Sequence, residues 1–132
     1  MRHPLAALAI LLAAQAPAGM LAAQPASPET VSVTLSSFKF APAELRLRHG
    51  RTYRLALINA SGGGHDFSAP EFFAASSIAA ADRGLVVDGK VKLAGKQTVE
   101  IVLTPGKAGA YALRCTHFLH SSMGMTGRII VE

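Results

Sequence analysis

The stretch Tyr111–Glu132, YALRCTHFLHSSMGMTGRIIVE, places a loop rich in soft metal donors between two short segments with apolar residues in alternation. In the first segment Tyr111, Leu113 and Cys115 alternate with Ala112 and Arg114, so the period of two puts these three residues on one face of a strand. Tyr111 and Leu113 are expected core residues, and the Cys115 sulfur should therefore point inward at the strand's end. After Gly127 the chain is expected to return to the sheet.

The same alternation recurs through the rest of the chain and predicts an all-β fold. Strands with one buried and one solvated face are indicated by such a pattern. Turn signals such as Ala41-Pro42, His49-Gly50, Asp88-Gly89 and Pro105-Gly106 separate the segments. About seven short strands with this punctuation favour an antiparallel β-sandwich. The expected strands cover residues 31–36, 45–48, 52–57, 90–93, 99–103, 111–115 and 128–132.

One segment departs from the alternation and predicts a helical insert. Ser68-Ala69-Pro70-Glu71 has the capping-box spacing, and Phe67 and Phe72 have the spacing of a hydrophobic staple. An alanine-rich stretch follows, which predicts a short helix from Ala69 to Ala81. The alternative interpretation is an irregular alanine-rich loop.

The N-terminus has the layout of a secretory leader. The basic start Met1-Arg2-His3 is followed by the apolar run Leu5–Ala14 and by small residues, with cleavage expected near residues 18–23. A retained N-terminal anchor is the alternative. We therefore expect a signal peptide at 1–23, a single mature domain at 24–132 and a periplasmic location. No downstream segment resembles a transmembrane helix, so stable membrane insertion is not expected after cleavage.

Charge excludes some classes of partner. The 132 residues include 13 Lys and Arg against 8 Asp and Glu, which gives a formal net charge of +5. The basic residues are spread along the chain and do not alternate with aromatic residues, as they would in a nucleic-acid site. We expect no nucleic-acid partner and a mild preference for acidic ones.

The single cysteine of an exported chain needs an account other than an internal disulfide. His120 follows Cys115 by five residues and Met125 follows His120 by five, which gives a set of soft donors. Iron–sulfur clusters need more cysteines, and structural zinc sites do not use methionine. Two histidines, one cysteine and a weak axial methionine form the donor set of electron-transfer copper sites. The second histidine is expected to be His65, because the preceding Gly62–Gly64 run allows a close approach to another loop.

These residues resemble the copper loop of the cupredoxins. The Cys115 to His120 gap is similar to that of azurin, and the run from His120 to Gly127 is similar to the His…Met-Gly-Met-x-Gly run of pseudoazurin. The resemblance spans residues 31–132 and implies an eight-stranded Greek-key sandwich with one copper ion at one end. It implies His65, Cys115, His120 and Met125 as metal ligands, with Met125 preferred to Met123 for its Met-x-Gly spacing.

The chain also departs from the cupredoxin pattern. Asp66 stands where the family often has an Asn whose side chain ties the two ligand loops together, and His117 and Met123 are extra donors. His117 is expected to pack or be exposed at the copper end; the alternative is that it binds the metal.

The expected function is that of a monomeric, non-enzymatic single-electron carrier of the blue copper type, with copper cycling between Cu(I) and Cu(II). A redox protein partner would dock on an apolar patch that includes Phe118 and Leu119. The alternative is a copper carrier or resistance protein that passes copper to a transfer partner, which the extra donors His117 and Met123 favour.

Overall fold

The computed structural model describes residues 19–22 and 26–132, and over this range the chain forms mainly β-strands. The strands are β1 (Glu29–Ser36), β2 (Lys39–Ala41), β3 (Glu44–Leu47), β4 (Tyr53–Asn59), β5 (His65–Ser68), β6 (Ser76–Ile78), β7 (Lys90–Leu93), β8 (Thr98–Pro105), β9 (Gly109–Arg114) and β10 (Thr126–Val131). The helix α1 (Pro70–Ala74) and the 3₁₀ helix η1 (Ala80–Leu85) lie between β5 and β7.

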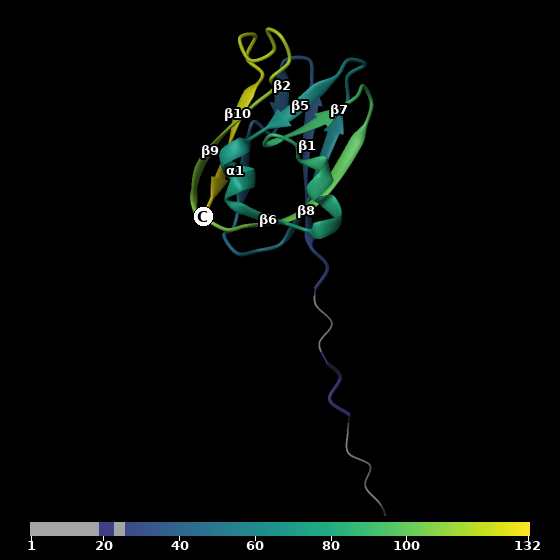
Figure 1. Ribbon diagram of the computed structural model, residues 1–132, viewed down its shortest axis with the longest axis vertical. Helices are drawn as coiled ribbons and strands as arrows, with labels where there is room; N and C mark the ends of the chain where they lie inside the picture. The colour runs from purple at the N-terminus through teal and green to yellow at the C-terminus, as the bar shows by residue number, and fades with distance from the viewer. Residues whose placement is uncertain (1–18, 23–25) are drawn as a thin grey trace, which may run out of the picture.

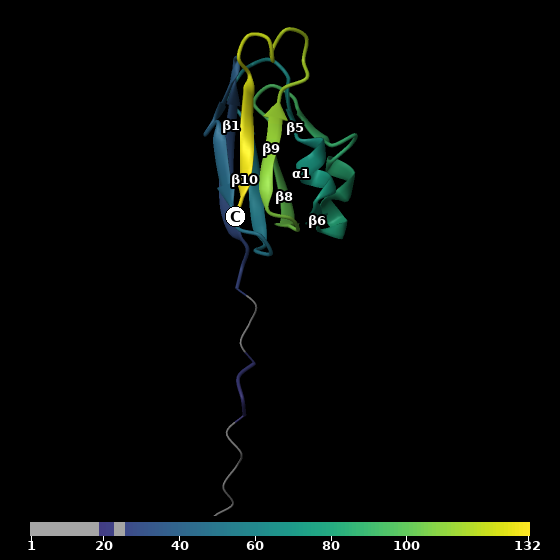
Figure 2. The same cartoon turned by 90° about the vertical axis from the view of Figure 1, so that its left-hand side faces the viewer.

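The strands form two five-stranded sheets packed face to face (Figures 1 and 2). One sheet has the order β2-β1-β4-β8-β6 and the other β3-β10-β9-β5-β7. The pairs β1–β4 and β3–β10 are parallel, and the remaining strand pairs are antiparallel. The β-sandwich expected from the alternation is confirmed, with ten strands in the described part of the chain instead of eight.

The core lies between the two sheets and follows the period of two. Val33, Leu57 and Ile101 of the first sheet and Phe67 and Ile129 of the second are fully buried. Removing a side chain of this size from water contributes about 1.5–3 kcal/mol. The core therefore supplies a rigid frame from which the loops at the sandwich's end project.

The insert after β5 is shorter and more varied than the predicted helix over Ala69–Ala81, and the capping-box interpretation was wrong. Ser68 belongs to β5, the N-cap residue is Ala69, and no side chain caps α1, which begins at Pro70. The alanine-rich stretch does not continue the helix, because Ser76–Ile78 pairs with β8. That pairing supplies backbone hydrogen bonds that a continued helix would have made within itself.

The strand predictions were right for the alternating segments and missed three strands without a visible alternation. The alternation of the seven predicted strands appears in β1, β3, β4, β7, β8, β9 and β10. β2 and β6 have only three residues each, and the four residues of β5 are all buried, so none of the three shows an evident alternation. His65, expected in a loop, is the first residue of β5.

The predicted leader lies largely outside the described residues, so its cleavage stays a prediction. Within residues 19–22 and 26–132, none of the helices has the length and apolar character needed to cross a bilayer. The chain enters the sandwich at the end opposite the loop between β9 and β10, which is yellow in Figure 1.

Candidate metal centre

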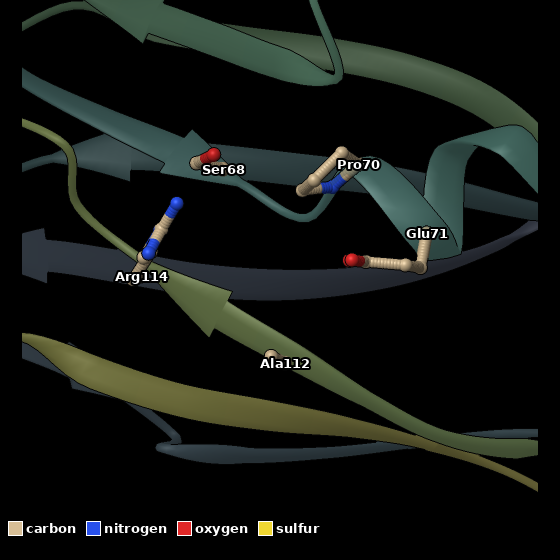
Figure 3. Close-up of a pocket in the computed structure, with 5 residues that line it drawn as sticks. All are labelled: Ser68, Pro70, Glu71, Ala112 and Arg114. Atoms are coloured by element: carbon tan, nitrogen blue, oxygen red, sulfur yellow. The ribbon is translucent and has the colours of Figure 1, made fainter.

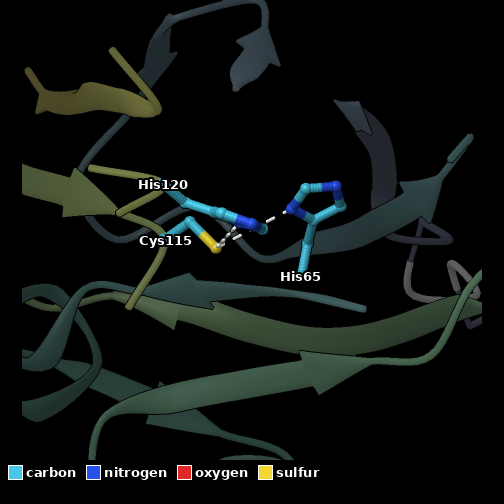
Figure 4. Close-up of side chains that lie close together, drawn as sticks. All are labelled: His65, Cys115 and His120. Atoms are coloured by element: carbon cyan, nitrogen blue, oxygen red, sulfur yellow. Dashed lines mark hydrogen bonds between the residues drawn. The ribbon is translucent and has the colours of Figure 1, made fainter. Parts of the chain in front are cut away.

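Three side chains converge at the end of the sandwich: His65, Cys115 and His120, here called the donor trio (Figure 4). Their candidate ligand atoms all lie within 4.8 Å of one another. The Cys115 Sγ is 3.8 Å from His65 Nδ1 and 3.4 Å from His120 Nδ1. Cys115 and His65 are buried and His120 is half-buried. The arrangement offers one sulfur and two imidazole nitrogens to a single ion.

The sheet topology brings His65 and Cys115 together although 50 residues separate them. β5 begins at His65 and β9 ends just before Cys115, and the two strands are antiparallel neighbours with Ser68 paired to Arg114. The beginning of β5 and the end of β9 therefore lie at the same end of one sheet. His65 therefore lies on a strand and Cys115 directly follows one.

The loop between β9 and β10 is closed by its own backbone, and this places His120. The Cys115 N–H donates to the Met125 carbonyl at 3.1 Å, and the Met125 N–H donates to the His120 carbonyl at 2.9 Å. The hydroxyl of Ser121 donates to the Cys115 carbonyl. Gly124 adopts a φ of 95°, which most other residues avoid. The return of the chain therefore folds His120 back towards the Cys115 sulfur.

The two methionines of this loop lie in different environments. Met125 is fully buried in the same core cluster as Cys115, whereas Met123 is 57% exposed. A buried thioether on a residue whose backbone bonds to both Cys115 and His120 is better placed than an exposed one to contribute a fourth, weak donor. The burial pattern therefore favours Met125.

The loop before His65 is held by Asn59, whose side chain is buried. Its amide donates to the carbonyls of Gly63 at 2.8 Å and Ala94 at 2.9 Å, and its oxygen accepts from the Ser61 N–H at 3.0 Å. These bonds join the first histidine loop to the β7–β8 turn. The expected close approach to another loop is present, and the residue that makes room for it is Gly95 of that turn.

Asp66 ties the two donor-bearing segments together, so its replacement of the usual Asn does not remove this link. Its Oδ1 accepts from the Thr116 N–H at 2.7 Å and its Oδ2 from the Thr116 hydroxyl at 2.5 Å. The backbone N–H of Asp66 is 3.4 Å from the Cys115 Sγ, towards which it donates. Asp66 itself is 2% exposed.

Burial sets the protonation of two members of the trio. It raises the pKa of the Cys115 thiol, an effect opposed by N–H groups of Asp66 and His117. Burial also lowers the pKa of His65, helped by the neighbouring His120 and His117. In the metal-free protein the neutral thiol and the neutral imidazole are thus favoured. Binding of a cation would release the thiol proton.

His117 lies beside the donor trio and is not a member of it. Its exposed ring stacks on that of His120, with 5.3 Å between centroids and 20° between planes, and its centroid is 6.3 Å from that of His65. Phe38 contacts the His120 ring edge-on, with centroids 5.3 Å apart. The imidazole of His120 therefore contacts the rings of His117 and Phe38 as well as that of His65, whose centroid is 4.9 Å away.

A hollow beside α1 is separate from this centre (Figure 3). It has a volume of about 150 Å³ and is lined by Ser68, Pro70, Glu71, Ala112 and Arg114. Its lining offers one carboxylate and one guanidinium but no sulfur or imidazole. It therefore lacks the soft donors of the trio.

Sequence reasoning named the three side chains that the structure brings together and missed the residues that support them. The missed residues contact the site or its loops but carry no motif of their own; they are Phe38, Lys90, Gly95 and Thr116. The signal available for Thr116 was its position next to Cys115, opposite the unusual Asp66. For Gly95 it was a turn glycine beside a glycine-rich loop.

The comparisons with known proteins agree with this geometry. The cupredoxin-like domain family matches residues 4–131, almost the whole chain. The chain therefore belongs to the cupredoxin-like family. Thiolate, imidazole and thioether are soft donors that suit copper. Together with the family, the donor set supports one copper ion as the cofactor.

Solved structures of auracyanins share the fold. Reduced auracyanin from Roseiflexus castenholzii is 15% identical with a TM-score of 0.59, over 81% of this chain and 99% of that one. Auracyanin B is 20% identical with a TM-score of 0.58, over 83% and 93%. Auracyanin A, a blue copper protein from Chloroflexus aurantiacus, is 20% identical with a TM-score of 0.56, over 80% and 100%. No curated protein matches the chain in sequence.

Proposed function

We propose that this protein is a periplasmic single-electron carrier of the blue copper type. The observation that carries the proposal is the convergence of one buried thiol and two imidazoles within 4.8 Å at the end of a rigid sandwich. The structural likeness to auracyanin A, described as a blue copper protein, agrees with it.

In this proposal His65, Cys115 and His120 hold the copper, and Met125 is the weak axial donor that tunes its potential. The bound ion supplies the redox change between Cu(I) and Cu(II). The chain's own contribution is rigidity. β5 and β9 fix two donors, and the Asn59 and Asp66 hydrogen bonds hold the loops. A site that moves little between the two oxidation states suits rapid electron transfer.

Electrons would pass through the half-buried His120, which contacts Phe38 and shares its loop with the exposed Phe118, Leu119 and Met123; these four apolar residues are here called the apolar patch. These side chains are 37%, 88%, 56% and 57% exposed. Exposed apolar surface of this kind marks a protein-interaction site. Lys39 follows Phe38, and Lys96 donates to the Ala60 carbonyl in the first histidine loop. An acidic redox protein would complement this end of the molecule.

The proposal makes the protein a monomeric carrier, not an enzyme. Within the described residues, the donor trio is the one cluster of three or more side chains that could hold a metal ion. Copper oxidases and reductases need further copper sites. The expected leader at residues 1–23 would deliver the mature domain, 24–132, to the periplasm.

The test is the visible spectrum of the purified mature domain loaded with Cu(II). An intense sulfur-to-copper charge-transfer band is expected in the wild type and should vanish in Cys115→Ser. Ser77→Ala, an exposed polar position on β6, is the control that should keep the band. A wild type that binds Cu(II) without this band contradicts the blue-type assignment.

The second candidate function is copper transfer. It is favoured by the exposed His117 stacked on His120 and by the exposed Met123, because extra soft donors at the surface could pass an ion onward. A transfer protein should bind Cu(I) far more tightly than Cu(II) and exchange it quickly, whereas a carrier of electrons should retain both states. Competition with Cu(I) chelators and reversible voltammetry distinguish the two.

A further inference from the structure

The side chains of Asp66, Thr116 and Lys90 form a chain of hydrogen bonds that ends beside Cys115. Lys90 Nζ is 3.1 Å from Thr116 Oγ1, which is 2.5 Å from Asp66 Oδ2. The Asp66 N–H points to the Cys115 Sγ at 3.4 Å. One buried anion and one half-buried cation are thus joined through a single hydroxyl, within one residue of the thiol.

The donor and acceptor groups of the three side chains fix the direction of these hydrogen bonds. A lysine ammonium can only donate, so the Thr116 oxygen accepts from Lys90 and gives its one hydrogen to Asp66 Oδ2. Asp66 Oδ1 already accepts the Thr116 N–H. Both oxygens of Asp66 therefore act as acceptors, which is the arrangement that an ionised carboxylate satisfies.

We propose that Asp66 and Lys90 are an opposed pair of positioning charges that set the reduction potential of the bound copper. This inference rests on the proposed electron-carrier function. The oxidised site carries one more positive charge than the reduced site. The Asp66 carboxylate favours the oxidised state and lowers the potential, and the Lys90 ammonium favours the reduced state and raises it.

Burial decides which charge has the larger effect. Asp66 is 2% exposed, so solvent screens its field weakly, whereas Lys90 is half-buried. One hydrogen bond to Thr116 holds the Lys90 ammonium near Asp66. The net effect is a lower potential than an amide at position 66 would give.

The chain offers a matched control for Lys90. Lys92 lies two residues further along β7, is paired in register with Asp66 and is exposed. It carries the same charge on the same strand but does not form the bond to Thr116. Both Lys90→Met and Lys92→Met therefore remove one positive charge from β7, but only Lys90→Met also removes the hydrogen bond to Thr116.

The experiment is protein-film voltammetry of the copper-loaded mature domain. Asp66→Asn, which keeps the shape and one acceptor oxygen, should shift the potential upward. Lys90→Met should shift it downward by more than Lys92→Met does, and Asp66→Asn combined with Lys90→Met should return it towards wild type. A loosened site would shift all variants the same way, so opposite shifts cannot come from a purely structural role.

A second readout needs no copper. In the metal-free protein the Thr116 amide should exchange slowly with solvent in the wild type, Asp66→Asn and Lys90→Met, and at least tenfold faster in Asp66→Ala. Shifts of the same sign in Asp66→Asn and Lys90→Met, equal shifts in Lys90→Met and Lys92→Met, or a rapidly exchanging Thr116 amide in the wild type overturn the inference. If the wild type also lacks the Cys115-dependent band, the proposed function itself has failed.

Discussion

Gly95 lies directly against the backbone of Gly62, so that a Cβ at position 95 would stand 2.1 Å from the Gly62 carbonyl oxygen. This contact joins the β7–β8 turn to the loop that leads into His65. The Lys96 N–H adds a bond of 3.0 Å to the Ser61 carbonyl beside it. The position of His65 therefore depends on the absence of a side chain 30 residues away.

Gly95→Ala should displace the first histidine loop. Because the clashing atoms are backbone, the change is expected to cost about 1–3 kcal/mol of the free energy of unfolding and to weaken copper binding. Gly63→Ala is the matched control, since a Cβ there meets no atom within 4 Å. Denaturant unfolding and copper titration measure both; equal behaviour of the two variants contradicts the contact's role.

Met125→Leu should separate packing from coordination. The swap conserves volume in a buried site, so the stability of the metal-free protein should fall by less than about 1.5 kcal/mol. The potential and spectrum of the copper form should change, because the weak axial donor is lost. Met123→Leu, at an exposed position, should leave both unchanged. The reverse pattern would assign the axial role to Met123.

Phe118→Ala should weaken binding to the redox partner without lowering the stability of the fold. Its side chain is 88% exposed, so the free energy of unfolding should change by no more than about 0.5 kcal/mol. Binding to the native redox partner should weaken about tenfold, as for an interface residue worth about 1.4 kcal/mol. Leu85→Ala, an exposed leucine on η1, is the control. Unchanged electron transfer in Phe118→Ala rules out the apolar patch as the docking surface.

The metal-free protein should lose stability on both sides of neutral pH. Folding lowers the pKa of His65, so its contribution is present above its ordinary pKa of 6.5 and is lost as the pH falls below it. Folding raises the pKa of Cys115, so its contribution is present below its ordinary value of 9.0 and is lost as the pH rises above it.

Urea unfolding at pH 5, 7.5 and 10 checks this dependence. His65→Gln should flatten the acidic side of the profile and Cys115→Ala the alkaline side, each leaving the other side as in the wild type. Identical profiles in all three proteins would show that other groups govern the pH dependence.

The alternation of apolar and polar residues predicted the sandwich because it recurs in strand after strand. In β8, Val99, Ile101 and Leu103 are buried and Glu100 is exposed, as the alternation required. The insert shows the limit of the same reasoning. Ser68 and Glu71 have the spacing of a capping box, yet Ser68 is a buried strand residue, because pairing of β5 with β7 and β9 outweighs a local capping preference.

The sequence by itself determined the strands of the sandwich and the kinds of donor that one loop carries, since alternation and ligand chemistry are properties of neighbouring residues. Only the tertiary structure decided how His65 meets Cys115 across 50 residues, that Gly95 leaves room for the loop that leads into His65 and that Lys90 reaches Asp66 through Thr116. These relationships depend on which strands become neighbours. That choice is made by burial of the whole core, a sum over contacts that no single segment of the chain contains.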